Sequence, residues 1–161
     1  MRNSEQKTAP GGRDFVVIYT DGGATPNPGL GGWAALLISP EHGGREKEIY
    51  GSEAGTTNNR MELTAAIMAL RALKRSCRVE IHTDSTYLKN AFVKGWLEKW
   101  QKNGWKTSAK EPVLNQDLWR ELLSLSETHA IEWVWTKGHA SDALNNRCDA
   151  LVQKAKDEHR K

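Results

Sequence analysis

Apolar residues along the chain follow two periodicities, which together predict a protein of strands and helices. Residues 15–20 form a continuous apolar run that is typical of a central strand buried on both faces. A second run at 33–38 and a shorter, more polar segment at 45–50 predict two more strands, the last at an edge of the sheet. Gly43-Gly44 between them predicts an antiparallel connection.

Helical and strand patterns alternate in the rest of the chain. Leu63, Ile67 and Leu70 share one face of a helix, which we expect over residues 58–75. The short segments 79–83 and 131–135 predict strands. Further helices are expected at 84–93, 94–102 and 115–126, and a last one carries the apolar stripe Leu144, Cys148, Leu151, Val152 and Ala155.

The order of these elements predicts an α/β fold in which helices cover a mixed sheet. Residues 14–161 show no repeat and no second domain, so we expect one domain. Residues 1–13 are polar, contain Pro10-Gly11-Gly12 and lack the apolar segment of a secretory signal. We expect them to form a flexible tail.

The composition indicates where the protein works more clearly than which reaction it catalyses. No apolar run approaches the roughly 20 residues that span a bilayer, so we expect no membrane span. Cys77 and Cys148 form no CxxC pair, and buried reduced thiols in a cytoplasmic protein are the expected state. The net charge of +3 is too small to identify a nucleic-acid partner. Five lysines and three tryptophans, however, gather within residues 94–110.

Four acidic residues occupy positions that favour a shared site. Asp21 and Asp84 each follow a predicted strand, and parallel pairing of those strands would bring the two carboxylates together. Glu62 lies near the start of the 58–75 helix, and Asp149 lies one turn into the last helix, beside its apolar stripe.

Each acid also has a purely structural interpretation. Asp21 precedes a glycine and can shape a turn, while Asp84 can cap a helix. Glu62 can close a capping box with Asn59, and Asp149 can belong to a solvated helix face.

Taken together, the four carboxylates favour a metal site. Clustered carboxylates repel one another unless cations neutralise them. Oxygen ligands without a Cys/His pattern favour Mg²⁺ or Mn²⁺ over zinc, and two such ions form the usual site for phosphodiester displacement. His139 follows Lys137-Gly138 and can shuttle a proton or help product leave, or can be an ordinary loop histidine.

The ordered motifs resemble bacterial type 1 ribonuclease H over residues 14–157. The matching segments are Thr20-Asp21-Gly22, Asn27-Pro28-Gly29, Gly31-Gly32, Thr56-Thr57-Asn58-Asn59-Arg60-Met61-Glu62-Leu63, Thr83-Asp84-Ser85, Gly104-Trp105-Lys106-Thr107, Asn115, Asp117-Leu118-Trp119, Lys137-Gly138-His139 and Asn146-Arg147-Cys148-Asp149. A single Thr-Asp-Gly would be a weak signal, whereas the whole set in this order is specific.

The resemblance implies a ribonuclease H-like fold, with a five-stranded mixed sheet in the order 3-2-1-4-5 flanked by helices. It implies that Asp21, Glu62, Asp84 and Asp149 bind two Mg²⁺ ions, which Mn²⁺ can replace, and that His139 is a mobile catalytic histidine. The implied activity is endonucleolytic hydrolysis of the RNA strand of RNA–DNA hybrids by a monomer. Cleavage would lack sequence specificity and leave 5′-phosphate and 3′-hydroxyl ends.

The same resemblance assigns substrate contacts. Asn27 and Asn59 would contact the hybrid, and Thr57 and Asn115 would hold a phosphate of the DNA strand. Asn58 is a further candidate for contacting the hybrid, but it can instead cap the helix.

Residues 94–110 resemble the basic protrusion, or handle, of many bacterial members. Lys99, Lys102 and Lys106 would neutralise phosphates there. Trp96 and Trp100 are four residues apart, which favours an apolar cluster that supports the handle. We assign stacking or sugar contact to Trp105 and, secondarily, to Trp96.

Three positions depart from the family pattern. Gly55 stands where several relatives carry an arginine near the phosphate pocket, Asn145-Asn146 replaces an Asn-Glu pair, and Ala24-Thr25 replaces a pair that contains cysteine. None of these changes removes one of the four acids.

Two alternative functions share many of these features. A hybrid-binding module without catalysis would keep the lysines and tryptophans but lose a carboxylate, and all four are present. A junction resolvase could use the same fold. The handle and the Asn27 and Asn59 motifs favour hybrid cleavage over junction resolution.

Overall fold

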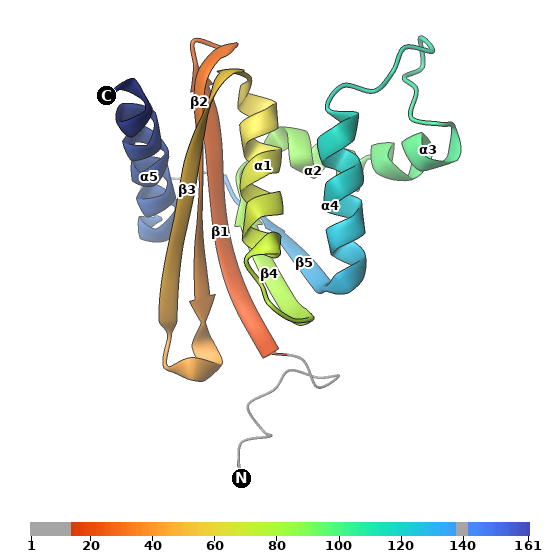
Figure 1. Cartoon of the computed structure of the whole chain (residues 1–161). Coiled ribbons are helices and arrows are strands. Elements are labelled where there is room, and N and C mark those ends of the chain that lie inside the picture. The colour runs from red at the N-terminus through yellow and green to blue at the C-terminus, as the bar shows by residue number, and fades with distance from the viewer. Residues whose placement is uncertain (1–13, 138–141) are drawn as a thin grey trace.

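The computed structural model describes residues 14–137 and 142–161 as a five-stranded mixed sheet with helices on both faces (Figure 1). The strands are β1 (Asp14–Thr25), β2 (Gly29–Ser39), β3 (Arg45–Thr56), β4 (Cys77–Thr83) and β5 (Ala130–Trp135). The helices are α1 (Asn58–Arg71), α2 (Thr86–Val93), α3 (Trp96–Lys102), α4 (Gln116–Thr128) and α5 (Ala143–Arg160), with a short 3₁₀ turn, η2 (Pro40–His42). The expected tail, residues 1–13, lies outside the described residues.

The strand order β3-β2-β1-β4-β5 confirms the topology that the resemblance implied. β1 pairs antiparallel with β2 and β2 with β3, while β1, β4 and β5 run parallel to one another. The chain therefore has a central strand, β1, with one antiparallel and one parallel neighbour. This is the mixed sheet expected from three early strands followed by alternating helices and strands.

β1 is longer than its apolar run. It continues through Asp21, which pairs with Ala34, and on to Thr25, which pairs with Leu30. The interpretation of Asp21 as a turn residue is therefore wrong. Ladder hydrogen bonds to β2 override the local preference of Asp-Gly-Gly for a turn, because the facing strand offers partners for the backbone on both sides of Asp21.

Two layers of helix bury the sheet (Figure 1). The predicted stripe of Leu63, Ile67 and Leu70 on α1 packs with Val16 and Ile18 of β1 in the larger core cluster. On the other face, Leu151 and Val152 of α5 pack with Ala34 of β2. α5 contacts β1, β2 and β3, so the antiparallel half of the sheet is covered on both faces.

The structure also bears on the expectations about the cysteines and about membrane spans. Cys77 and Cys148 are buried and unbonded to each other, as expected. Burial raises the pKa of the Cys148 thiol to about 12, which keeps it protonated and unreactive. In the described part of the chain, every helix is too short or too polar to cross a membrane.

Candidate active site

Gly22 allows the first turns of α1 to lie directly against β1. A Cβ atom at position 22 would stand 2.5 Å from the carbonyl carbon and oxygen of Met61 and 2.8 Å from the amide nitrogen of Glu62. No real side chain tolerates such distances to backbone atoms, so only glycine permits this approach. The close approach carries Glu62 to the strand that bears Asp21.

Helix caps near the site are supplied by residues other than the acids. Thr57 caps α1, its hydroxyl accepting a hydrogen bond from the Arg60 amide at 3.2 Å. Ser85 caps α2, its hydroxyl accepting from the Leu88 amide at 3.1 Å. The capping interpretations of Glu62 and Asp84 are therefore wrong, and both carboxylates are free of that local task.

Parallel pairing places Asp21 and Asp84 side by side, as the sequence predicted. Tyr19 of β1 is in register with His82 of β4, so the positions two residues further along face each other at the carboxyl ends of this pair. Asp84 follows the last residue of β4 and is exposed, whereas Asp21 is partly buried.

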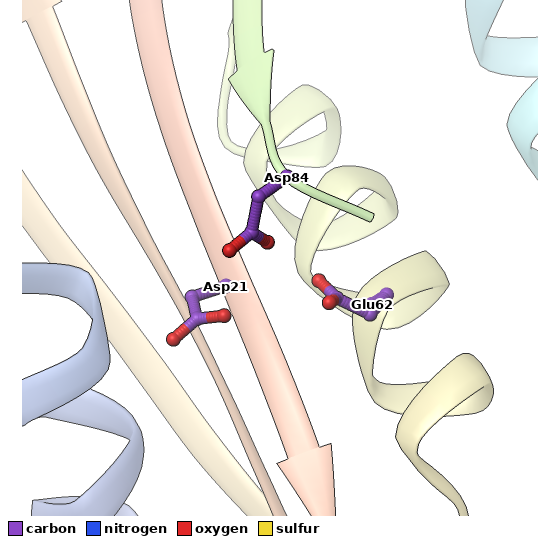
Figure 2. A group of neighbouring side chains, drawn as sticks. All are labelled: Asp21, Glu62 and Asp84. Atoms are coloured by element: carbon purple, nitrogen blue, oxygen red, sulfur yellow. The ribbon is translucent and has the colours of Figure 1, made fainter. Parts of the chain in front are cut away.

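The carboxylates of Asp21, Glu62 and Asp84 converge from β1, α1 and the end of β4 (Figure 2). One oxygen of each lies within 4.8 Å of the others. Burial, with the charges of Asp84 and Asp149, raises the pKa of Asp21 to about 7. Burial, with Asp21 and Asp84, raises the pKa of Glu62 well above its ordinary value. The cluster is thus short of positive charge.

The donor set fits a hard divalent cation. Oε1 of Glu62 is buried and has no hydrogen-bond partner, which is costly unless a ligand completes its coordination. The three side chains offer only carboxylate oxygens, the ligands that Mg²⁺ and Mn²⁺ prefer.

Asp149, the fourth predicted acid, is placed less closely than the other three. Asp149 lies on α5 and is exposed. It is near enough to raise the pKa of Asp21, but it is not one of the three acids whose oxygens converge. His139 falls in residues 138–141, outside the described residues, so its role stays a prediction.

The asparagines at the start of α1 are joined to the loop after β1. The Asn58 side-chain oxygen accepts a hydrogen bond from the Ala24 amide at 2.6 Å. The backbone N–H of Asn58 in turn donates a hydrogen bond to the side-chain oxygen of Asn27, with a distance of 3.1 Å. Asn58 is the first helical residue and not the cap, so its capping interpretation is wrong. Asn59 is exposed beside this pair.

A polar network that the sequence analysis did not single out surrounds Asn115. Arg60 donates hydrogen bonds to the side chains of Asn115 and Asp117, and the contact lowers the pKa of Asp117. Asn115 also contacts the hydroxyl of Tyr87. The only signal for Arg60 in the sequence was its place inside the Thr56–Leu63 motif.

The handle rests on an aromatic cluster, as the spacing of its tryptophans predicted. Trp100 lies 6.1 Å from both Trp96 and Trp105 and 5.9 Å from Trp119, measured between ring centroids. Trp105 is only 7% exposed, so its burial argues against a main role in stacking on substrate. Trp96 is half-buried and borders a cavity, which makes it the better-placed ring.

The handle lysines are exposed around this base. Lys99 and Lys102 line a hollow of about 450 Å³ together with Lys94 and Glu98. Lys102 is 3.9 Å from Glu98, a solvent-exposed contact of little energetic weight. Lys106 is also exposed. These side chains are available to a polyanion.

Comparisons with known proteins show what the chain is similar to. The family model described as RNase H matches residues 13–157. Proteins named Ribonuclease H from Moorella thermoacetica and Francisella tularensis subsp. novicida are 56% and 54% identical, over 87% and 89% of this chain and 90% and 91% of theirs. The crystal structure of LC9-RNase H1, a type 1 RNase H with the type 2 active-site motif, superposes with a TM-score of 0.79. It is 30% identical and covers 91% of this chain and 74% of that one.

A more distant structure shares the fold. LC11-RNase H1 in complex with RNA/DNA hybrid superposes with a TM-score of 0.65 at 24% identity, over 91% of this chain and 99% of that one.

Replacing Gly22 by alanine tests the approach of α1. The Cβ would collide with the Met61 backbone and push Glu62 away, so we expect a stability loss of about 1–3 kcal/mol and at least about tenfold weaker Mn²⁺ binding. Gly23→Ala is the matched control, because its Cβ would meet only the Asn58 oxygen, at 3.5 Å. Calorimetric titration and thermal melts measure both effects. Equal Mn²⁺ affinity in the two variants would contradict this account.

Asp21→Asn tests the electrostatic strain of the metal-free cluster. The pKa of Asp21 is about 7 when folded and about 4 when unfolded, so between these values the native state binds more protons. Its stability therefore falls as the pH rises through this interval. Without divalent metal, we expect the variant to be more stable than the wild type near pH 8. The gain is at most about 1.4 kcal/mol for each pH unit that separates the two pKa values, and it should shrink toward pH 4.

Denaturant unfolding in chelator, followed across this pH range, measures the effect. Added Mg²⁺ should then stabilise the wild type more than the variant, since only the wild type keeps all the ligands. A variant that is less stable at every pH would show that Asp21 is held by favourable contacts and not by repulsion.

Proposed function

This chain belongs to the ribonuclease H family, and from that premise we propose that it hydrolyses the RNA strand of RNA–DNA hybrids as an endonuclease. The convergence of Asp21, Glu62 and Asp84 at one end of the parallel strands carries the proposal. We propose further that cleavage lacks sequence specificity, leaves 5′-phosphate and 3′-hydroxyl ends, and is performed by a monomer in the cytoplasm.

The carboxylates define what the chain itself contributes to catalysis. Asp21, Glu62, Asp84 and Asp149 would hold two Mg²⁺ ions, or Mn²⁺ in their place. When bound, such ions supply an activated water and neutralise charge on the departing oxygen. The β1 and α1 backbones fix Asp21 and Glu62 before substrate arrives, so little reorganisation is needed. His139 would move a proton at the leaving group or help product to leave.

The asparagine pair offers hydrogen-bond donors to the minor groove. The oxygen of Asn58 is used by Ala24 and the oxygen of Asn27 by the Asn58 amide. Each side chain therefore keeps its NH₂ group for other partners. RNA differs from DNA through 2′-hydroxyls that line a wide, shallow minor groove, and amide donors suit those oxygens. Together with Asn59, this pair would read the RNA strand.

The handle would bind the phosphates of the hybrid. Its lysines are exposed and lie on α3 and the segment after it, on a rigid tryptophan base. α3 lies at one end of the molecule, away from α5 (Figure 1). It would therefore extend the contact surface beyond the carboxylate cluster.

Cleavage of labelled nucleic acids tests the proposed activity. We expect Mg²⁺-dependent cutting of RNA within an RNA–DNA hybrid, no cutting of single-stranded RNA, duplex DNA or a four-way junction, and loss of activity in chelator. Asp21→Asn should lower kcat by at least about 1,000-fold while the fold is retained, because a ligand charge is lost. Wild-type turnover in that variant, or preferential junction cleavage, would refute the assignment.

Removing the positive charges of the handle tests whether its lysines bind the phosphates of the hybrid. Replacing Lys99, Lys102 and Lys106 by alanine should raise KM and reduce the salt slope of binding by about 0.9 for each phosphate that is no longer neutralised, with kcat less affected. The control replaces Lys47, Lys74 and Lys161, which are exposed elsewhere and make the same change in net charge. If both triple variants have the same salt slope, the handle does not bind phosphate.

A further inference from the structure

Arg60 joins the start of α1 to the start of α4. Its guanidinium donates two hydrogen bonds to the carboxylate of Asp117, Nη1 to Oδ1 at 3.1 Å and Nη2 to Oδ2 at 2.9 Å. Nη1 also donates to Oδ1 of Asn115 at 3.1 Å. The charge of Arg60 is therefore neutralised by a bidentate ion pair with Asp117. The same guanidinium also contacts the side-chain amide of Asn115.

These contacts fix which way the Asn115 side chain points. Arginine has donors but no acceptor, so the Asn115 oxygen must face Arg60. The Asn115 nitrogen then donates to the hydroxyl oxygen of Tyr87 at 3.1 Å, which uses one of its two hydrogens. Asn115 adopts a left-handed backbone conformation, with φ of 62°, and makes no side-chain cap to α4. Its second N–H remains to bind something else.

The Tyr87 hydroxyl is likewise left with a hydrogen to donate. Its hydroxyl oxygen accepts from Asn115 and also from the indole Nε1 of the fully buried Trp119 at 3.0 Å. Two incoming hydrogen bonds use the acceptor capacity of a phenol oxygen, so only its own O–H is left. The Thr57 hydroxyl likewise accepts from the Arg60 amide and keeps its proton. In residues 14–137 and 142–161, none of these three hydrogens has a hydrogen-bond acceptor.

None of the described residues that line the cavity beside Tyr87 and Asn115 is a lysine or an arginine. Tyr87 and Asn115 line a cavity of about 200 Å³ with Asn59, Trp96 and Thr107. Position 55, two residues before Thr57, is an exposed glycine and supplies no charge. The cation that the network does contain, Arg60, is paired with Asp117.

We infer that Arg60 is a positioning residue that locks Asn115 and, through it, the Tyr87 hydroxyl as hydrogen-bond donors, so that this chain grips a DNA-strand phosphate with neutral donors. The inference rests on the proposed function, because that function brings a hybrid to this surface. Thr57, Asn115 and Tyr87 supply the donors, and Arg60 acts through Asn115. Neutral donors do not replace counterions on the phosphate, so this contact adds affinity without adding to the salt slope.

A matched pair of arginine variants tests the inference. Arg60 and Arg71 both lie on α1, and each makes an ion pair with α4, Arg60 with Asp117 and Arg71 with Glu121. Arg60→Met should weaken binding of a short labelled RNA–DNA hybrid and raise KM by about five- to tenfold, the loss expected for one or two hydrogen bonds. Its kcat should stay within about twofold. Arg71→Met should change neither constant.

Two further readouts exclude a merely structural role. A neutral methylphosphonate linkage is placed in turn at each position of the DNA strand. One position should weaken wild-type binding, and that position should have no further effect in Arg60→Met. Tyr87→Phe should show the same loss of position dependence. The salt slope of Arg60→Met should equal that of the wild type.

The outcomes separate the two proposals. If the wild type neither binds nor cleaves the hybrid, the proposed function fails. If it does both, but Arg60→Met and Arg71→Met behave alike, the positioning role is wrong. A reduced salt slope in Arg60→Met would mean that Arg60 itself binds phosphate as a cation, which also overturns the neutral pocket.

Discussion

Mutual repulsion among three carboxylates is the constraint on which the rest of the structure depends. Asp21, Glu62 and Asp84 come from three different elements and are held together with too little positive charge among them. Such an arrangement persists only when the surrounding fold is stable enough to impose it. Ladder pairing of β1 and the contact of α1 through Gly22 supply that rigidity. The electrostatic strain is then available to drive binding of divalent cations.

Neighbouring residues relieve the acids of local structural work. Thr57 and Ser85 cap the two helices that begin beside the site, so Glu62 and Asp84 make no cap bonds. Because Thr57 and Ser85 do the capping, the carboxylates of Glu62 and Asp84 receive no hydrogen bonds from the helix ends. A carboxylate that capped a helix would have its oxygens engaged by backbone N–H groups and would be a poorer metal ligand.

The proposed substrate surface uses two kinds of contact with different physical behaviour. The exposed lysines of the handle would bind phosphates through their charge, and that contribution would fall as the salt concentration rises. The network of Arg60, Asn115 and Tyr87 would bind through oriented hydrogen-bond donors. Arg60 orients the side-chain amide of Asn115, and Asn115 in turn leaves the Tyr87 hydroxyl free to donate. A duplex held by both would be attracted over a distance by the first and placed in register by the second.

The sequence by itself determined the properties that depend on near neighbours in the chain. Periodicity marked the strands and helices, and the ordered motifs identified the four acids and the family. Pairing partners, however, are not encoded locally. Asp21 lies within a strand and not at a turn because β2 faces it, and Trp105 is buried because Trp100 packs against it. Only the tertiary structure could bring Arg60 to Asn115, since long-range packing decides which distant polar groups satisfy one another.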